Sequence, residues 1–166
     1  MKKVLPVIML IVLLLGIIII RESDNKTDEF DSYVRDNFYE IASGNVDDPS
    51  RLTVEKGLDI INLRVEARYY PVYENGKLAY CLELYKVDGD IGFAFPGSAV
   101  DALEQLFAVD DKNIAIFAVG DRLFGYTGDY VIDFRERKLI EPKEFKFDLP
   151  ELTSYSHKKV KFNVKK

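Results

Sequence analysis

Few residues of this sequence combine the types and spacing that covalent catalysis requires. Cys81 and His157 are the single cysteine and the single histidine, so they form the one Cys/His pair that could supply a nucleophile and its base. No glycine-rich turn or helix start near Cys81 would lower the pKa of its thiol. We therefore expect a packed cysteine and a surface histidine. Ser98 lacks the second glycine of a nucleophile elbow and is expected to cap a helix.

The acidic residues occur in short groups that lack the order of a metal site. Asp88-Gly89-Asp90 has neither the further carboxylates nor the closing glutamate of a calcium loop, so it predicts a turn. The acid pairs at 47–48 and 110–111 are expected in solvated loops. A glycosidase-type acid pair stays open as an alternative, because distances are not visible in a sequence. One cysteine excludes an intramolecular disulfide and multi-cysteine metal sites. We expect no metal, no other cofactor and no enzymatic activity.

Tyrosines gather on one predicted hairpin and are the most distinctive polar group of the chain. Tyr70 and Tyr85 lie near Arg68 and Glu66, a set suited to recognising a peptide or a glycan. The alternative interpretation is that these tyrosines stabilise the sheet as cross-strand aromatic pairs.

The strongest structural signal is a β-hairpin that turns at Asn75-Gly76. Residues 63–73 and 77–86 alternate between apolar and polar side chains on either side of this turn, whose two residues favour positive φ. A regular register from the turn places Arg68 directly opposite Glu83, so that the two charges attract.

Further segments complete an α+β pattern. Apolar residues recur every three or four positions over 28–42 and again after Ser98, which predicts two amphipathic helices. Strands are predicted after the hairpin and after the second helix, at 91–95, 114–119, 123–126, 130–134, 145–149 and 160–164. This order predicts an α+β fold in which one antiparallel sheet is packed with two helices.

An unbroken apolar run from Val4 to Ile20 precedes this domain, with basic residues on both sides. Such a run spans about 25 Å as a helix, near the short limit for crossing a membrane. No small-residue cleavage pattern follows it, which favours an uncleaved, single-pass signal anchor over the alternative, a cleaved signal peptide. The lysines before the run favour a cytoplasmic N-terminus. The predicted organisation is an N-terminal transmembrane anchor at 1–21, a polar tether at 22–28 and an extracytoplasmic domain at 29–166.

Charge is distributed unevenly along the chain. The formal net charge is −5, but residues 21–157 hold 16 basic and 28 acidic residues. An acidic body repels a phosphate backbone, which argues against nucleic acid as a partner. Lys159, Lys161 and Lys165 alternate with apolar residues and predict an edge strand that lysines protect from unwanted pairing. The alternative is that these lysines contact anionic lipids or wall polymers.

These features together predict a membrane-anchored, extracytoplasmic binding or interaction module of the cell envelope. The expected partners are the membrane, through residues 4–20, and an envelope protein, peptide or glycan. The alternative is an inhibitor or prodomain-like regulator that adds a strand to an extracytoplasmic hydrolase. The short basic start and economical anchor are typical of bacterial proteins, so the expected location is a bacterial cell membrane.

Overall fold

Two amphipathic helices and one large sheet make up the part of the chain that the computed structural model describes, which is residues 28–46, 48–155 and 158–160. The predicted α+β class is therefore confirmed. The predicted anchor lies outside these residues. Across the described ranges, no helix combines the length and the apolarity that crossing a bilayer requires.

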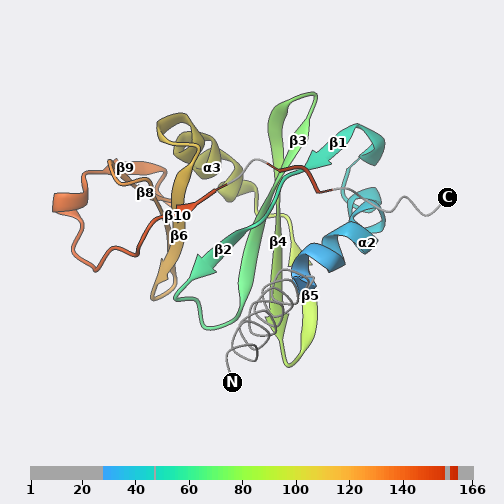
Figure 1. The fold of residues 1–166 in the computed structure, drawn as a ribbon, viewed down its shortest axis with the longest axis horizontal. Helices are drawn as coiled ribbons and strands as arrows, with labels where there is room; N and C mark the ends of the chain where they lie inside the picture. The colour runs from blue at the N-terminus through green and yellow to red at the C-terminus, as the bar shows by residue number, and fades with distance from the viewer. Residues whose placement is uncertain (1–27, 47, 156–157, 161–166) are drawn as a thin grey trace, which may run out of the picture.

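The strands form one sheet with two halves (Figure 1). In spatial order the main strands are β5 (Asp90–Ala94), β4 (Lys77–Val87), β3 (Ala67–Glu74), β2 (Leu58–Ile61), β6 (Asn113–Val119), β7 (Arg122–Tyr126), β8 (Val131–Asp133) and β9 (Lys138–Ile140). Two short strands, β1 (Leu52–Val54) and β10 (Thr153–Ser154), pair with β3 and β6 respectively.

Strand β2 joins the two halves and makes the sheet mixed rather than wholly antiparallel. It pairs antiparallel with β3 on one side and parallel with β6 on the other. The expectation of a purely antiparallel sheet is therefore wrong. The reason is that β2, a four-residue strand, was not among the predicted strands, and it alone makes the parallel pairing.

Helix α2 (Glu29–Ser43) confirms the helix predicted at 28–42. Asp28 caps its start, because the Asp28 carboxylate accepts hydrogen bonds from the amides of Phe30 and Asp31. The helix buries one apolar stripe against the sheet. The buried side chains are Phe30, Val34, Phe38, Ile41 and Ala42.

Helix α3 (Gly97–Val109) confirms the second predicted helix, but its start differs from the expectation. Pro96 is the N-cap residue and no side chain makes a capping hydrogen bond, so Ser98 lies inside the first turn. The prediction that Ser98 caps the helix is wrong, because the fixed φ of Pro96 already sets the entry of the chain. The helix contacts β4 in one half of the sheet and β7 and β8 in the other.

The predicted hairpin at Asn75-Gly76 is confirmed, with positive φ at both turn residues. Its first strand begins at Ala67 rather than at residue 63. The register that the turn predicts holds only for the two pairs next to it, Glu74 with Lys77 and Tyr73 with Leu78. Between Val72 and Tyr73 it shifts by one residue, which leaves Ala79 of β4 as the extra residue of a β-bulge.

The bulge changes which side chains share a face. Beyond it, Arg68 lies opposite Leu84, and Glu83 lies opposite Tyr69. The predicted Arg68–Glu83 pair is therefore wrong, because a one-residue shift moves every later side chain of one strand to the other face. Arg68 and Glu83 end on opposite faces of the sheet.

Apolar cover is present on both faces. Helix α3 packs on one face across both halves. On the other face, α2 covers β3 to β5, and the segment after β9 covers β6 to β8. In that segment Phe145 packs edge-on against Phe117 and Phe124, so the strand predicted at 145–149 is wrong. Its apolar residues cover the core without entering the sheet.

The C-terminal segment lies beside both halves of the sheet. After β10, the main chain of Lys158 and Val160 hydrogen-bonds to that of Lys56 and Val54. The backbone of Lys159 lies opposite that of Glu55 in an isolated antiparallel β-bridge. The first residue of the predicted C-terminal strand, Val160, is thus hydrogen-bonded to the backbone of Val54. The remainder of that strand, including Lys161 and Lys165, lies outside the described residues.

Candidate functional site

Strand β5 is one end of the sheet, and its outer side has no partner strand among the described residues. A two-residue turn at Asp88-Gly89, with positive φ at both positions, brings it antiparallel to β4. The predicted strand at 91–95 is confirmed, and Phe93 lies opposite Leu84 of β4.

The register fixes which main-chain groups of β5 point outward. Val87 and Asp90 flank the two-residue turn, so they form a hydrogen-bonded pair, and the bonded and non-bonded pairs then alternate. Gly92 therefore bonds inward to β4. The N–H and C=O groups of Ile91 and Phe93 point to the free edge. This edge presents two donor–acceptor pairs to an incoming strand.

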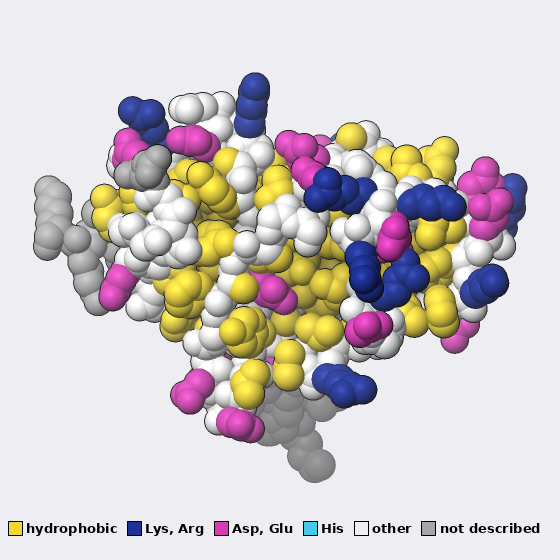
Figure 2. Space-filling model, turned by 180° about the vertical axis from the view of Figure 1, so that it is seen from behind, with side chains coloured by type: hydrophobic (Ala, Val, Ile, Leu, Met, Phe, Trp, Pro, Cys, Tyr) yellow, Lys and Arg dark blue, Asp and Glu magenta, His cyan; other side chains and the backbone are white. Residues whose placement is uncertain are grey.

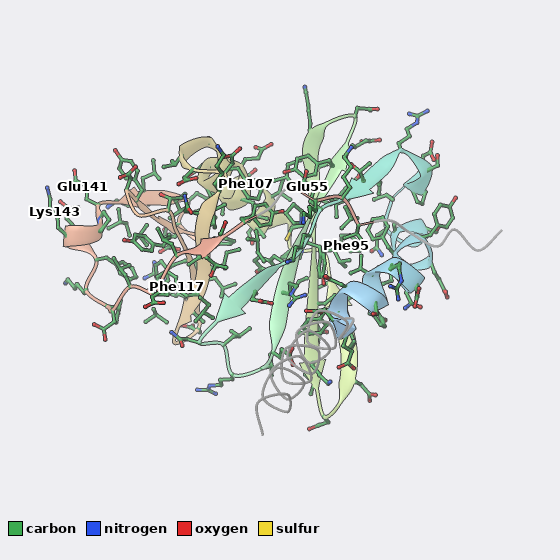
Figure 3. The ribbon with its side chains drawn as sticks, in the orientation of Figure 1. Glu55, Phe95, Phe107, Phe117, Glu141 and Lys143 are labelled. Atoms are coloured by element: carbon green, nitrogen blue, oxygen red, sulfur yellow. The ribbon has the colours of Figure 1, made fainter. Side chains whose placement is uncertain are left out.

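An apolar stripe runs along the same edge on the side that α2 covers. Ile91 and Phe95 are half-buried against the α2 core, whereas the Phe93 side chain is 42% exposed. Phe95 makes an edge-to-face contact with Tyr80, at 6.4 Å between ring centres, and is labelled beside α2 in Figure 3. An extended segment docked on β5 would cover the exposed part of this stripe.

Hydrophobic side chains are distributed unevenly over the surface of the molecule. Figure 2 views the molecule from behind and shows hydrophobic side chains in a broad band across the middle of that face. Among the described residues, eight large hydrophobic side chains are exposed, and they belong to several elements: Tyr39, Val87, Phe93, Val109, Tyr130, Leu139, Phe147 and Leu152.

Several features that normally protect an edge are missing from β5, although the strand begins with the exposed charge of Asp90. Its sequence, Asp-Ile-Gly-Phe-Ala, contains no lysine, no proline and no bulge. The opposite end of the sheet differs, since β9 has three residues and begins with an exposed lysine, Lys138. Of the two ends, β5 is the longer and less protected. It is the candidate binding surface of the domain.

A second group of polar residues surrounds Arg68, which is only 8% exposed. Its Nη1 atom lies 2.8 Å from the Asp28 carboxylate and 3.2 Å from that of Asp31, and its Nε lies 2.6 Å from that of Asp59. Tyr70 donates its hydroxyl to Asp31 at 2.6 Å. A cleft of about 310 Å³ opens beside this group, between the start of α2 and strands β2, β6 and β10.

The electrostatics of this group indicate a structural role. Burial acts to lower the pKa of Arg68, but hydrogen bonds to Asp59 and Tyr70 outweigh it, so the pKa is raised. Burial and the hydrogen bond to Asp31 raise the pKa of Tyr70. Both side chains therefore keep one protonation state at any physiological pH. The group fastens the start of α2 to the sheet.

The tyrosine surface expected from the sequence does not form. Tyr70 is fully buried and Arg68 nearly so, both on the face that α2 covers. Tyr85 is half-buried on the opposite face, where its ring lies over Gly92. Glu66 is exposed just before β3. The shift at the bulge separates Tyr70 from Tyr85, and it was not foreseen.

Of the residues considered for catalysis, Cys81 lies on strand β4 and Ser98 in the first turn of helix α3. Cys81 is buried at 1% exposure, and burial, with a smaller effect of Glu83, raises the pKa of its thiol. His157 lies outside the described residues. Asp110 accepts hydrogen bonds from the amides of Lys112 and Asn113, as expected of a loop carboxylate. Within the described ranges, no group of three or more His, Cys, Asp or Glu side chains is placed to hold a metal ion.

Comparison of the chain with protein-family models, with curated proteins and with solved structures gave no match. The edge site therefore rests on the geometry alone. The sequence predicted strand β5 but not that β5 lies at the end of the sheet. The one sequence feature that could have indicated a binding edge was the absence of lysine and proline from this strand, which is followed directly by a helix.

Proposed function

We propose that this protein is a membrane-anchored binding module of the cell envelope that is not an enzyme. Its domain would face away from the cytoplasm, and the edge of strand β5 would be its binding surface. The observation that carries the binding proposal is that outward-pointing backbone groups at Ile91 and Phe93 coincide with an exposed aromatic side chain. Backbone pairing supplies affinity in such sites, and alternate side chains supply specificity.

The anchored, outward-facing placement is supported by the sequence. The apolar run at 4–20, the lysines before it and the absence of a cleavage pattern after it all favour a retained anchor. N-terminal sequencing of the membrane-extracted protein measures retention. The proposal predicts a terminus at residue 1 or 2, and a mature terminus near 21–30 would contradict it.

Binding at the edge is tested by a matched pair of substitutions at one position. Ile91→Pro removes an outward N–H without breaking a bond to β4, whereas Ile91→Ala keeps that N–H and shortens the same side chain. The full chain is affinity-purified from membranes as wild type and as both variants. Partners that use the edge should be recovered with wild type and Ile91→Ala and lost with Ile91→Pro. Equal recovery with all three chains would contradict the proposal.

A second candidate function uses the same edge. A free strand of this kind also suits an inhibitor or prodomain-like regulator, which adds a strand to the cleft of an extracytoplasmic hydrolase. The two functions differ in what the recovered partner does. The regulator hypothesis predicts that a hydrolase is recovered and that the added domain changes its rate, with Ile91→Pro abolishing the change.

A further inference from the structure

If strand β5 is the binding surface, as the proposed function holds, the distribution of charge along its edge indicates which kind of peptide segment binds there. Asp88 and Asp90 are both exposed at the turn end, and within the described part of the chain neither side-chain carboxylate makes a hydrogen bond or an ion pair. The nearest cation on the same hairpin, Lys86, already pairs with Glu29 at 2.6 Å. The turn end therefore carries two carboxylates without a partner.

The rest of this half of the molecule reinforces that charge. Residues 28–110 contain seven basic and seventeen acidic residues, whereas residues 111–155 contain seven basic and nine acidic ones. The opposite end of β5 leads through Pro96 into α3 and carries no charged residue between 91 and 100. The charged residues along this edge are thus acidic, and they lie at the turn.

We propose that β5 binds an extended peptide segment of a partner protein whose apolar residues alternate and whose end beside Asp88 and Asp90 carries a lysine or arginine. The two outward backbone pairs at Ile91 and Phe93 require an extended main chain. The exposed Phe93 ring selects apolar side chains at alternate positions on the α2 side. The unpaired carboxylates select a cationic end, and they repel the acidic residues 28–110 of a second copy of this chain.

Synthetic peptides test this chemistry without knowledge of the natural partner. The probe is acetyl-Lys-Val-Thr-Val-Thr-Val-Lys-amide, whose sequence reads the same in both directions, so either orientation places a lysine near the turn. The control peptide carries glutamate in place of both lysines. Each is titrated into the ¹⁵N-labelled full chain in micelles of an uncharged detergent, and backbone amide spectra are recorded.

The lysine peptide should shift the outward amides of Ile91 and Phe93 saturably, with a smaller change at the inward amide of Gly92. It should bind at least about fivefold more tightly than the glutamate peptide, as expected for one or two exposed charge pairs. This preference should fall in 0.5 M salt and disappear in the double variant Asp88→Asn, Asp90→Asn. Ile91→Pro should abolish the shifts, and Ile91→Ala should retain them.

Three outcomes would overturn the inference, and they differ in meaning. Equal binding of both peptides at β5 would refute the cationic segment while leaving the edge as a binding surface. Absence of shifts at Ile91 and Phe93 with either peptide would refute the edge itself, and with it the proposed function. A dimer of the full chain that Ile91→Pro dissociates would make a second copy the occupant.

Discussion

Arg68 shows how one side chain connects three elements at the level of single residues. It is nearly buried, yet its partners Asp28, Asp31 and Asp59 are 33–71% exposed. Water therefore screens much of each attraction, and the contribution of Arg68 comes from several contacts that act together. It also packs over the Phe30 ring, at 5.7 Å from the ring centre.

Replacement of Arg68 by methionine should lower the free energy of unfolding by about 2–3 kcal/mol, because the carboxylates lose their shared cation and α2 loses its attachment to β2 and β3. The matched control is Arg35→Met on the exposed side of α2, where one exposed pair with Asp36 is lost and the change should stay within about 0.5 kcal/mol. Urea unfolding followed by circular dichroism measures both. Equal effects of the two substitutions would contradict the structural role of Arg68.

Gly57 is required beside Arg68 because of space. A Cβ atom at this position would overlap Cδ and Cγ of Arg68 and lie 2.8 Å from Cζ of Tyr70. Gly57→Ala should therefore cost about 1–3 kcal/mol of unfolding free energy. At Gly97, by contrast, an added Cβ meets nothing within 4 Å, so Gly97→Ala should be neutral or slightly stabilising. A neutral Gly57→Ala variant would mean that Arg68 moves at no cost.

Glu83 gives the domain a predictable dependence on pH. It is half-buried opposite Tyr69, and burial raises the pKa of its carboxyl above the usual 4.5. A raised folded pKa means that the contribution of Glu83 is fully present below pH 4.5 and is lost as pH rises through the folded pKa. Glu83→Gln should therefore raise the unfolding temperature by roughly 1–3 °C at pH 7 and by less at pH 4.

The measurement is the difference in unfolding temperature between wild type and Glu83→Gln across pH 4 to 8. Exposed Glu66 supplies the control, since Glu66→Gln should give a small difference that does not follow the same pH profile. A Glu83→Gln difference that is constant across the range would show that the ionisation of Glu83 does not act on stability.

Among the elements, the helices and the hairpin turn were predictable from the sequence, whereas the bulge was not. The turn has a strong local cause in Asn75-Gly76, and α2 has both its cap and its apolar spacing. The bulge at Ala79 has no such local signature, because alternation on both sides of it looks regular in the sequence. As a result the hairpin was predicted correctly, but the faces of Arg68, Tyr70 and Tyr85 were not.

Long-range pairings were the other part that the sequence did not reveal. Strand β2 has four residues and β10 has two, too few for a clear alternating pattern, and their partners lie far away in the chain. The apolar residues near Phe145 misled for the opposite reason. Their spacing suits a strand, but they cover the core as an irregular segment. Only the complete order of the strands shows that β5 lies at the end of the sheet, so the sequence did not identify β5 as a free edge.

Tyr155 links the C-terminal segment to the rest of the domain. Its ring stacks on Phe107 of α3 at 5.6 Å between ring centres, and its hydroxyl donates a hydrogen bond to the Lys56 carbonyl at 3.0 Å, close to Glu55. Tyr155→Ala should cost about 2–4 kcal/mol of unfolding free energy and speed hydrogen exchange at the amides of Lys56 and Val160. Tyr39→Ala, at a 45% exposed position, is the control and should change neither. Unchanged exchange at Lys56 in Tyr155→Ala would contradict this role.

At the scale of the whole molecule, the two ends of the sheet differ in length and in protection. One end has a five-residue strand with an exposed phenylalanine and two unpaired carboxylates, and the other has a three-residue strand that begins with lysine. A membrane anchor before α2 would hold this asymmetric domain at the envelope surface and raise its local concentration near other envelope proteins. The proposed function therefore requires that β5 meets a partner in the cell.

Photo-cross-linking in intact cells tests that claim most directly. A photoreactive phenylalanine analogue replaces Phe93 on β5, Tyr39 on α2 or Leu139 on β9, three positions whose side chains are 42%, 45% and 46% exposed. A discrete heavier adduct is expected from position 93, and it should be absent from positions 39 and 139 and lost when Ile91→Pro is added. No adduct at 93, or equal adducts at all three positions, would contradict the claim that the β5 edge is the binding surface.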